Sequence, residues 1–201
     1  MPTPNPLRQH LLRMAYNNAW ANYRLLGACM QLSPADFEAQ RCSFFPSIQA
    51  TLNHSLYVDW FYLDAMEREL QGLAPHPDCY VFFEKEQPFA QCAELRAEQM
   101  RIDERLIRYC EAQSDADLQR PVTIARPGRP QIDSRSRLLA HLFQHQIHHR
   151  GQVHAMLAGT SVSPPQLDEF FCAGEAEERA ADFAALGWTE TLVFGESAAG
   201  T

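Results

Sequence analysis

The chain has 201 residues and a formal net charge of −8, from 17 basic and 25 acidic side chains. This length is sufficient for one domain that buries a substantial core. Proteins that bind duplex nucleic acid usually present a basic face, so the acidic balance argues against a nucleic-acid partner. The sequence contains no apolar run of membrane-spanning length and no signal-peptide block, so we expect a cytoplasmic protein without a membrane partner.

Neither the basic residues nor the cysteines indicate a binding or catalytic site. Five arginines make up one short basic stretch, which we interpret as a solvated loop: Arg120, Arg126, Arg129, Arg135 and Arg137. The six cysteines form no C-x-x-C pair, which argues against a zinc ribbon or a dithiol redox motif. We expect them to be mostly small core residues in a reducing compartment.

Four long helical patterns follow one another along the chain. The first covers about residues 6–30, with Asn5 as a candidate N-cap and Pro6 at the first helical position. The second begins near Ser47 and ends before Gly72. A loop rich in proline and aromatic residues follows, and the third helix covers about residues 89–113.

Residues 119–133 separate the third helix from the fourth. Val122-Thr123-Ile124 and the Pro127-Gly128 turn indicate a small hairpin there. The fourth helix starts near Ser134 and stops at Gly159, and a further helical stretch lies around residues 175–185. The sequence therefore predicts an all-α protein, with a four-helix bundle over residues 1–160 and an extension, residues 161–201, that packs on it.

The fourth helical pattern carries four histidines in nine residues: His141, His145, His148 and His149. Histidines four positions apart lie on one helix face, at the spacing that lets two imidazoles bind one metal ion. Taking 100° per residue, the phase of the apolar residues places His145 and His149 at the edge of the core. The same phase places His141 and His148 toward solvent or in an outer layer of the site.

A fifth histidine, His54, lies in the middle of the second helix, which has two apolar stripes. We expect the stripe with His54 to face the bundle, where this histidine would complete a three-point site with the pair on the fourth helix. A helix that is apolar on both sides is buried on both sides. The other stripe then needs a cover, either the C-terminal segment or the second subunit of a homodimer.

The chain resembles the DinB family, within the DinB/YfiT-like superfamily of metalloproteins. Three segments carry the resemblance: residues 16–22 (YNNAWAN), residues 52–54 (LNH) and residues 145–152 (HQIHHRGQ). Pro164-Pro165-Gln166-Leu167-Asp168 fits as well. The resemblance implies a four-helix bundle, often dimeric, with His54, His145 and His149 as metal ligands. It also implies relatives that act with a low-molecular-weight thiol, as S-transferases or isomerases.

Three neutral imidazoles would leave a divalent metal ion with its full charge and an open position. We favour zinc or nickel, and manganese or iron would also accept these ligands. Gln146 stands where a zincin protease has its glutamate base, so proteolysis by that mechanism is disfavoured. Gln146 and Arg150 are candidate catalytic residues because their phase points them near the core side, and Arg150 should meet a carboxylate or a substrate anion there.

Three functions remain open at this point. The first is metal-assisted thiol transfer or isomerisation of a small-molecule substrate, with thiolate at the open position. The second is hydrolysis by metal-bound hydroxide. The third is a metal-binding or ligand-binding protein without turnover. We see no chemical role for residues 171–201.

Overall fold

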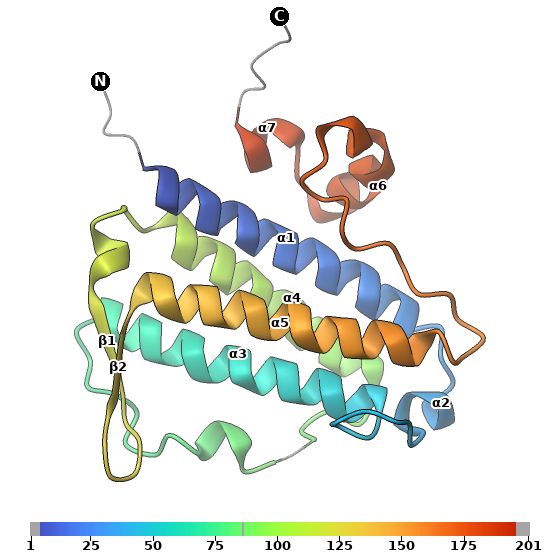
Figure 1. Ribbon diagram of the computed structural model, residues 1–201, viewed down its shortest axis with the longest axis horizontal. Helices are drawn as coiled ribbons and strands as arrows, with labels where there is room; N and C mark the ends of the chain where they lie inside the picture. Colours follow the sequence, from blue (N-terminus) through green and yellow to red (C-terminus); the bar gives the residue numbers. More distant parts are fainter. Residues whose placement is uncertain (1–4, 86, 196–201) are drawn as a thin grey trace, which may run out of the picture.

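The computed structural model describes residues 5–85 and 87–195. Its four long helices are α1 Pro6–Cys29, α3 Ile48–Leu70, α4 Cys92–Glu111 and α5 Arg135–Leu157. They form a bundle in which α1 and α3 each pack against both α4 and α5 (Figure 1). The predicted all-α fold is confirmed. Within the described ranges, no helix has both the length and the apolar character needed to cross a membrane.

Short elements connect and cover the bundle. The helical ones are α2 Pro34–Glu38, η1 Val81–Phe83, η2 Asp117–Gln119, η3 Ala173–Glu175, α6 Ala176–Leu186 and α7 Glu190–Phe194. Strands β1 Pro121–Ile124 and β2 Gln131–Ser134 pair antiparallel, with Pro121 opposite Ser134. This is the small hairpin expected between the third and fourth long helices, and it lies at one end of the bundle (Figure 1).

Side-chain caps start the two helices that carry the histidines. Ser47 Oγ accepts from the backbone N–H of Ala50 at the start of α3, and Ser134 Oγ accepts from that of Arg137 at the start of α5. Such caps satisfy backbone donors that the first helical turn leaves free. The expected Asn5 cap on α1 is wrong, because its side chain makes no capping bond and instead accepts from the backbone N–H of Asp115.

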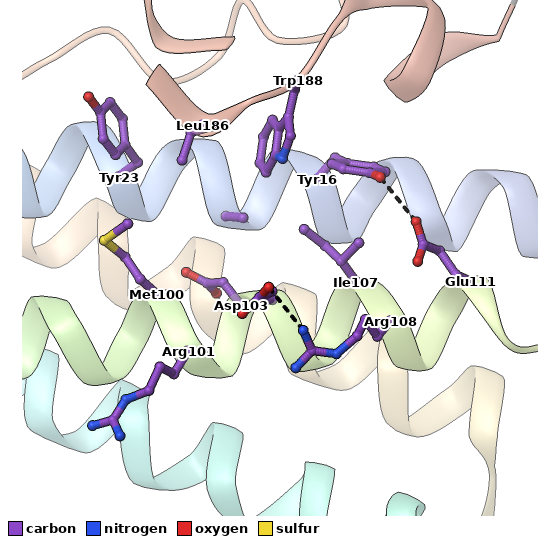
Figure 2. A pocket seen from close by; sticks show the side chains of 12 residues that line it. Tyr16, Tyr23, Met100, Arg101, Asp103, Ile107, Arg108, Glu111, Leu186 and Trp188 are labelled. Carbon is purple, nitrogen blue, oxygen red and sulfur yellow. Dashed lines mark hydrogen bonds and ion pairs between the residues drawn. The ribbon is translucent and has the colours of Figure 1, made fainter. Parts of the chain in front are cut away.

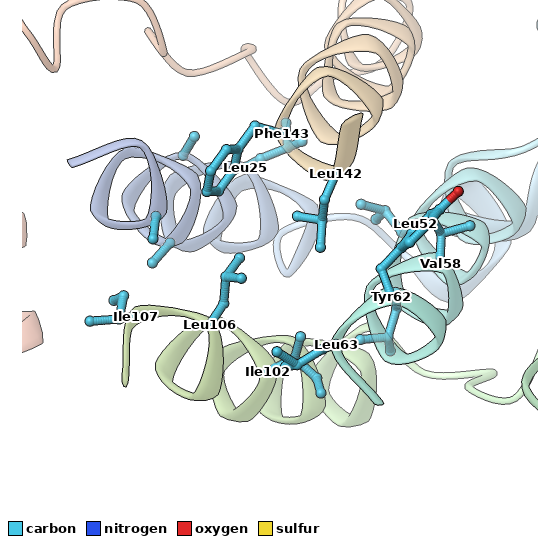
Figure 3. Close-up of a cluster of buried hydrophobic side chains, with 14 of the residues drawn as sticks. Leu25, Leu52, Val58, Tyr62, Leu63, Ile102, Leu106, Ile107, Leu142 and Phe143 are labelled. Carbon is cyan, nitrogen blue, oxygen red and sulfur yellow. The ribbon is translucent and has the colours of Figure 1, made fainter. Parts of the chain in front are cut away.

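Leucines from all four helices meet in the centre of the bundle. Leu25 on α1, Leu63 on α3, Leu106 on α4 and Leu142 on α5 are each at most 1% exposed (Figure 3). Burying one such side chain contributes about 1.5–3 kcal/mol. The core therefore fixes the relative positions of α3 and α5, the two helices on which the histidines lie.

The two stripes of α3 face opposite to the expected directions. The stripe without His54 faces the bundle, where Leu56 and Leu63 are fully buried, and only Leu70 at its end is exposed. The stripe with His54 lies on the flank of the bundle, where residues 81–83 and β1 pack over it. There the Phe83 ring lies 5.3 Å from that of Phe61, centroid to centroid. Loops of the same chain thus cover α3, because the connection between α3 and α4 supplies aromatic side chains.

The C-terminal segment packs on α1. Asp182 on α6 accepts hydrogen bonds from Trp20 Nε1 at 3.0 Å and from Arg24 Nε at 2.6 Å. Near the end of the described chain, the backbone carbonyl of Phe194 accepts from Arg13 at 2.6 Å. Residues 161–195 therefore cover an outer face of α1 rather than the flank of α3 (Figure 1).

The interpretation of one arginine needs correction, whereas most of the cysteines lie in or against the core, as expected. Arg135 is fully buried at the start of α5, where it donates to Glu69 and to Gln113 Oε1. It is therefore not part of a solvated loop, although the other four arginines of that stretch are exposed. All six cysteines are free thiols, but Cys42 and Cys172 are exposed rather than in the core.

Candidate metal centre

His54, His145 and His149 come together on the flank of the bundle between α3 and α5. The Nε2 atom of His145 lies 3.0 Å from Nε2 of His54 and 3.1 Å from Nε2 of His149. One potential ligand atom from each of the three residues lies within 4.8 Å of the other two. The structure therefore brings together the three histidines that the sequence selected.

The local geometry follows from helix spacing and from one contact between helices. His145 and His149 are one turn apart on α5, so both rings project from the same face. Between them, Gln146 is buried and donates from Nε2 to the backbone carbonyl of Ser55 at 3.1 Å. Because Ser55 follows His54 directly, this bond fixes the height of α5 against α3 at the level of the three rings.

Side chains on the outer sides of two rings orient them. His149 Nδ1 lies 2.8 Å from Gln152 Oε1, and a carbonyl oxygen can only accept, so Nδ1 carries the proton. Nε2 of His149 then presents its lone pair to the centre of the cluster. His54 Nδ1 is 3.2 Å from the hydroxyl of Tyr57. Outer hydrogen bonds of this kind set the tautomer and the orientation of metal-binding histidines.

The donor set fits a divalent cation. Nε2 of His145 faces Nε2 of both other histidines at about 3 Å, and the three nitrogens cannot all be satisfied by sharing protons, because a neutral imidazole donates from only one nitrogen. Tetrahedral ligands at 2.0–2.1 Å from zinc lie about 3.3 Å apart, close to these spacings. His145 Nδ1, on the other side of its ring, is buried without a hydrogen-bond partner among the described residues.

Burial keeps all three imidazoles neutral at neutral pH. It lowers the pKa of His145 to about 3, helped by the neighbouring histidines His149 and His54. Burial and the proximity of His149 lower the pKa of His54 to about 4. The pKa of His149 is also lowered by burial, against the opposing effect of its hydrogen bond to Gln152. Neutral imidazoles are the form that binds a metal ion.

An aromatic ring covers part of the cluster. Phe45, from the loop before α3, stacks on the His54 ring with 4.1 Å between centroids and lies tilted 5.6 Å from that of His149. The adjacent Phe44 is 83% exposed and contacts Phe45 edge to face. Periodicity could not have identified Phe45, because it lies in a loop, and Gln152 could have been recognised only by its three-residue spacing from His149.

The remaining histidines of the run lie outside the cluster, in agreement with their helical phase. His141 and His148 are exposed, and His148 shares a hydrogen bond with Gln152 at 3.1 Å. His154 bonds to the backbone carbonyl of Pro165 through Nε2, at 3.0 Å.

Arg150 points into the bundle, but it does not pair directly with a carboxylate of the described residues. Its Nη1 donates to the side-chain oxygens of Asn18 and Asn22 on α1. The amide groups of both asparagines donate to Asp103 on α4. The guanidinium is therefore satisfied by amides that stand between it and the carboxylate. Asn18 and Asn22 lie in the YNNAWAN segment, and two asparagines four apart in an apolar stretch were an overlooked signal.

Two buried carboxyl groups belong to the same polar network. Gln99 on α4 donates to Asp59 at 2.9 Å and to Asp103 at 3.2 Å. Burial raises the pKa of Asp59 to about 7, with a further contribution from the charge of Asp103, and it raises the pKa of Asp103 to about 6. The network joins all four helices beside the histidine cluster, and neither carboxyl group was selected from the sequence.

The sequence and the fold both match those of known proteins. The family model of the DinB family matches residues 1–180. The chain belongs to the DinB family. It is 28% identical over 153 residues to Protein DinB of Bacillus subtilis (strain 168), covering 73% of this chain and 85% of the relative. A DinB-like crystal structure from Bacillus cereus superposes with a TM-score of 0.53 at 16% identity, covering 73% of this chain and 90% of the other. The match to the family model confirms the family resemblance, and the superposition on the crystal structure supports the fold.

Proposed function

We propose that this DinB-family protein is a divalent-metal-dependent enzyme that acts on a small molecule, with His54, His145 and His149 as the metal ligands. The convergence of three Nε2 atoms at 3.0 and 3.1 Å carries the proposal. We favour zinc or nickel as the ion, and manganese or iron would also accept imidazole ligands. When bound, such an ion supplies positive charge that lowers the pKa of a water or thiol at its open position.

The chain's own side chains hold the rings and limit the access of water. Gln152 and Tyr57 orient His149 and His54, and Phe45 covers one side of the cluster. Among the described residues, the hydrogen-bond partners of the three histidines include no carboxylate. A reaction that needs a strong protein base next to the metal ion therefore has little support.

Gln146 and Arg150 have structural roles in this proposal. Gln146 donates to a backbone carbonyl of α3, and Arg150 donates to two asparagines of α1. Both side chains are at most 6% exposed. Because these hydrogen bonds link α5 to α3 and to α1, we assign both side chains to holding the helices in place rather than to moving protons.

Thiol transfer or isomerisation is the reaction class that we favour. Neutral ligands leave the site positively charged, so an anionic thiolate would be attracted, and a thiolate is a nucleophile that requires no protein base. Hydrolysis by an activated water is the alternative reaction. A low-molecular-weight thiol is accordingly the proposed co-substrate.

Metal content tests the ligand set. Protein purified without a histidine tag should contain one divalent ion per chain, and His145→Ala should lose it. His148→Ala is the matched control, because His148 lies on the same helix but outside the cluster, and it should keep the ion. Full metal retention in His145→Ala would overturn the ligand assignment.

Cobalt substitution tests the reaction class. With cobalt in the site, small thiols at millimolar concentration should produce a sulfur-to-cobalt charge-transfer band, and turnover in a substrate screen should require added thiol. An unchanged spectrum together with thiol-independent turnover would favour hydrolysis. Neither a spectral change nor turnover would indicate a metal-binding protein without catalysis.

The homodimer remains a prediction as well. The sequence predicts a dimer because one apolar stripe of α3 needs a cover, but loops of the same chain already cover that helix. Light scattering over a wide concentration range tests it, and a strict monomer would contradict it.

A further inference from the structure

A cavity separate from the histidine cluster lies on the bundle between α1, α4 and the C-terminal segment. Its volume is about 420 Å³, within the range of small-molecule sites. The apolar part of its wall consists of Tyr16, Tyr23, Met100, Ile107, Leu186 and Trp188 (Figure 2). None of these residues belongs to the histidine cluster, which α3 and α5 build.

The aromatic rings of this cavity come from α1 and from the turn after α6. Tyr16 and Trp188 pack edge to face, with 4.9 Å between ring centroids. Tyr23 already has the guanidinium of Arg96 over its ring, 5.3 Å from the centroid. Faces of Trp and Tyr rings attract organic cations as well as apolar groups.

The charged groups of the cavity leave an excess of carboxylate. Arg108 pairs with Glu104 at 3.0 Å, and Arg101 pairs with Glu98, so both arginines at the rim are neutralised. Asp103, in contrast, forms no ion pair with any described residue, although three amide groups donate to it. It is one of the residues that line the cavity, and it is only 4% exposed.

Glu111 is the second carboxylate without an ion pair. Within the described ranges its side chain accepts only the hydroxyl of Tyr16, at 3.1 Å, as Figure 2 shows. Arg8 approaches this end of α4 but donates to the backbone carbonyl of Glu111. The network behind the cavity also holds two carboxyl groups, Asp59 and Asp103, against the single guanidinium of Arg150.

We propose that this cavity binds a small organic cation, with its ammonium group near Glu111 and its apolar body against Ile107 and Trp188. The carboxylates of Asp103 and Glu111 would repel an anion. A bare metal ion would leave the aromatic and aliphatic wall without a contact. A protonated amine with an aromatic or branched aliphatic body satisfies both parts of the site.

Three probes of similar size and different charge test the proposal on the full-length protein. They are 2-phenylethylamine, which is protonated at neutral pH, the neutral 2-phenylethanol and the anionic 3-phenylpropanoate. Calorimetry and ligand-observed NMR should show saturable binding of the amine, with the other two at least tenfold weaker. Equal binding of all three probes, or no binding of the amine at millimolar concentration, would overturn the proposal.

Two variants locate the site. Glu111→Gln should weaken amine binding about tenfold, and Trp188→Leu should weaken it by a similar factor, both without loss of the metal ion. Glu94→Gln is the control, because Glu94 is exposed on the same helix and lies outside the cavity, and it should bind as the parent does. Amine binding that both cavity variants leave unchanged would place the ligand elsewhere and refute the assignment.

Discussion

Arg150 on α5 donates from Nη1 to the side-chain oxygen of Asn22 on α1 at 3.0 Å, and the same atom donates to Asn18. The amide groups of both asparagines in turn donate hydrogen bonds to the carboxylate of Asp103 on α4. The guanidinium of Arg150 is thus linked to the carboxylate of Asp103 through amide hydrogen bonds rather than by a direct ion pair. Arg150 directly follows the histidine His149 in the sequence.

Removal of this guanidinium should destabilise the fold. Arg150→Met would leave two asparagine oxygens without a donor and two buried carboxyl groups without a nearby positive charge. We expect the free energy of unfolding to fall by about 3–5 kcal/mol, measured by urea denaturation. Arg137→Met, in an exposed side chain of the same helix, should change it by less than about 0.5 kcal/mol. Equal effects of the two substitutions would contradict a central role for the network.

Asp59 should make stability depend on pH. Burial raises the pKa of its carboxyl group to about 7, whereas in the unfolded chain the group ionises near 3.8. The folded protein therefore holds a proton that the unfolded chain releases between these values, so this group's contribution lowers the free energy of unfolding as pH rises from about 4 to about 7.

Asp59→Asn tests this dependence by removing the ionisation. The stability of the variant, relative to the parent and measured without metal, should increase as pH rises from 4 to 7. Asp78→Asn, at an exposed position, should show no such trend. A flat difference between Asp59→Asn and the parent would show that Asp59 ionises normally.

Phe45 should control how fast the metal ion leaves. Phe45→Ala removes the ring that stacks on His54, so chelator and water would reach the centre more easily. We expect the stoichiometry of metal to stay the same and the rate of metal removal by a chelator to rise several-fold. Phe44→Ala removes an exposed ring that does not stack on His54, and its rate should match the parent. Identical rates for both variants would exclude a covering role.

Asp182 should hold the C-terminal segment on α1. Asp182→Ala takes the acceptor away from Trp20 Nε1 and Arg24 Nε. Limited proteolysis should then cut within residues 161–195 faster than in the parent, while metal content stays constant. Asp168→Ala, in an exposed position of the same segment, serves as the control. Unchanged cleavage in Asp182→Ala would show that apolar packing alone fixes the segment.

The sequence predicts the features that arise within one helix. Helical phase separates His145 and His149 from His141 and His148, because the direction of each side chain depends only on its position along α5. The same local logic predicts Ser47 as the start of α3 and the hairpin before α5. It fails for Asn5, whose oxygen finds a donor 110 residues away.

Features that depend on two distant segments could not be predicted. Arg135 is interpreted as solvated because arginine is usually exposed, and its partner Glu69 lies on another helix. Arg150 has the same difficulty, since its asparagine partners lie on α1. The directions of the two α3 stripes are opposite to those expected, because the stripe with His54 is covered by residues 81–83 and β1, which carry no periodic signal.

Trp188 lies beyond residue 180, where the match to the family model ends. Leu186 and Asp182 lie beyond it too, whereas the three histidines fall well inside the shared segment. One side of the cavity wall, Leu186 and Trp188, thus lies outside the segment that matches the family model, while its other side belongs to the shared bundle. Members of the family could keep the histidine centre while differing in these two residues, so exchanging only the C-terminal segment between relatives should change amine binding and leave metal binding intact.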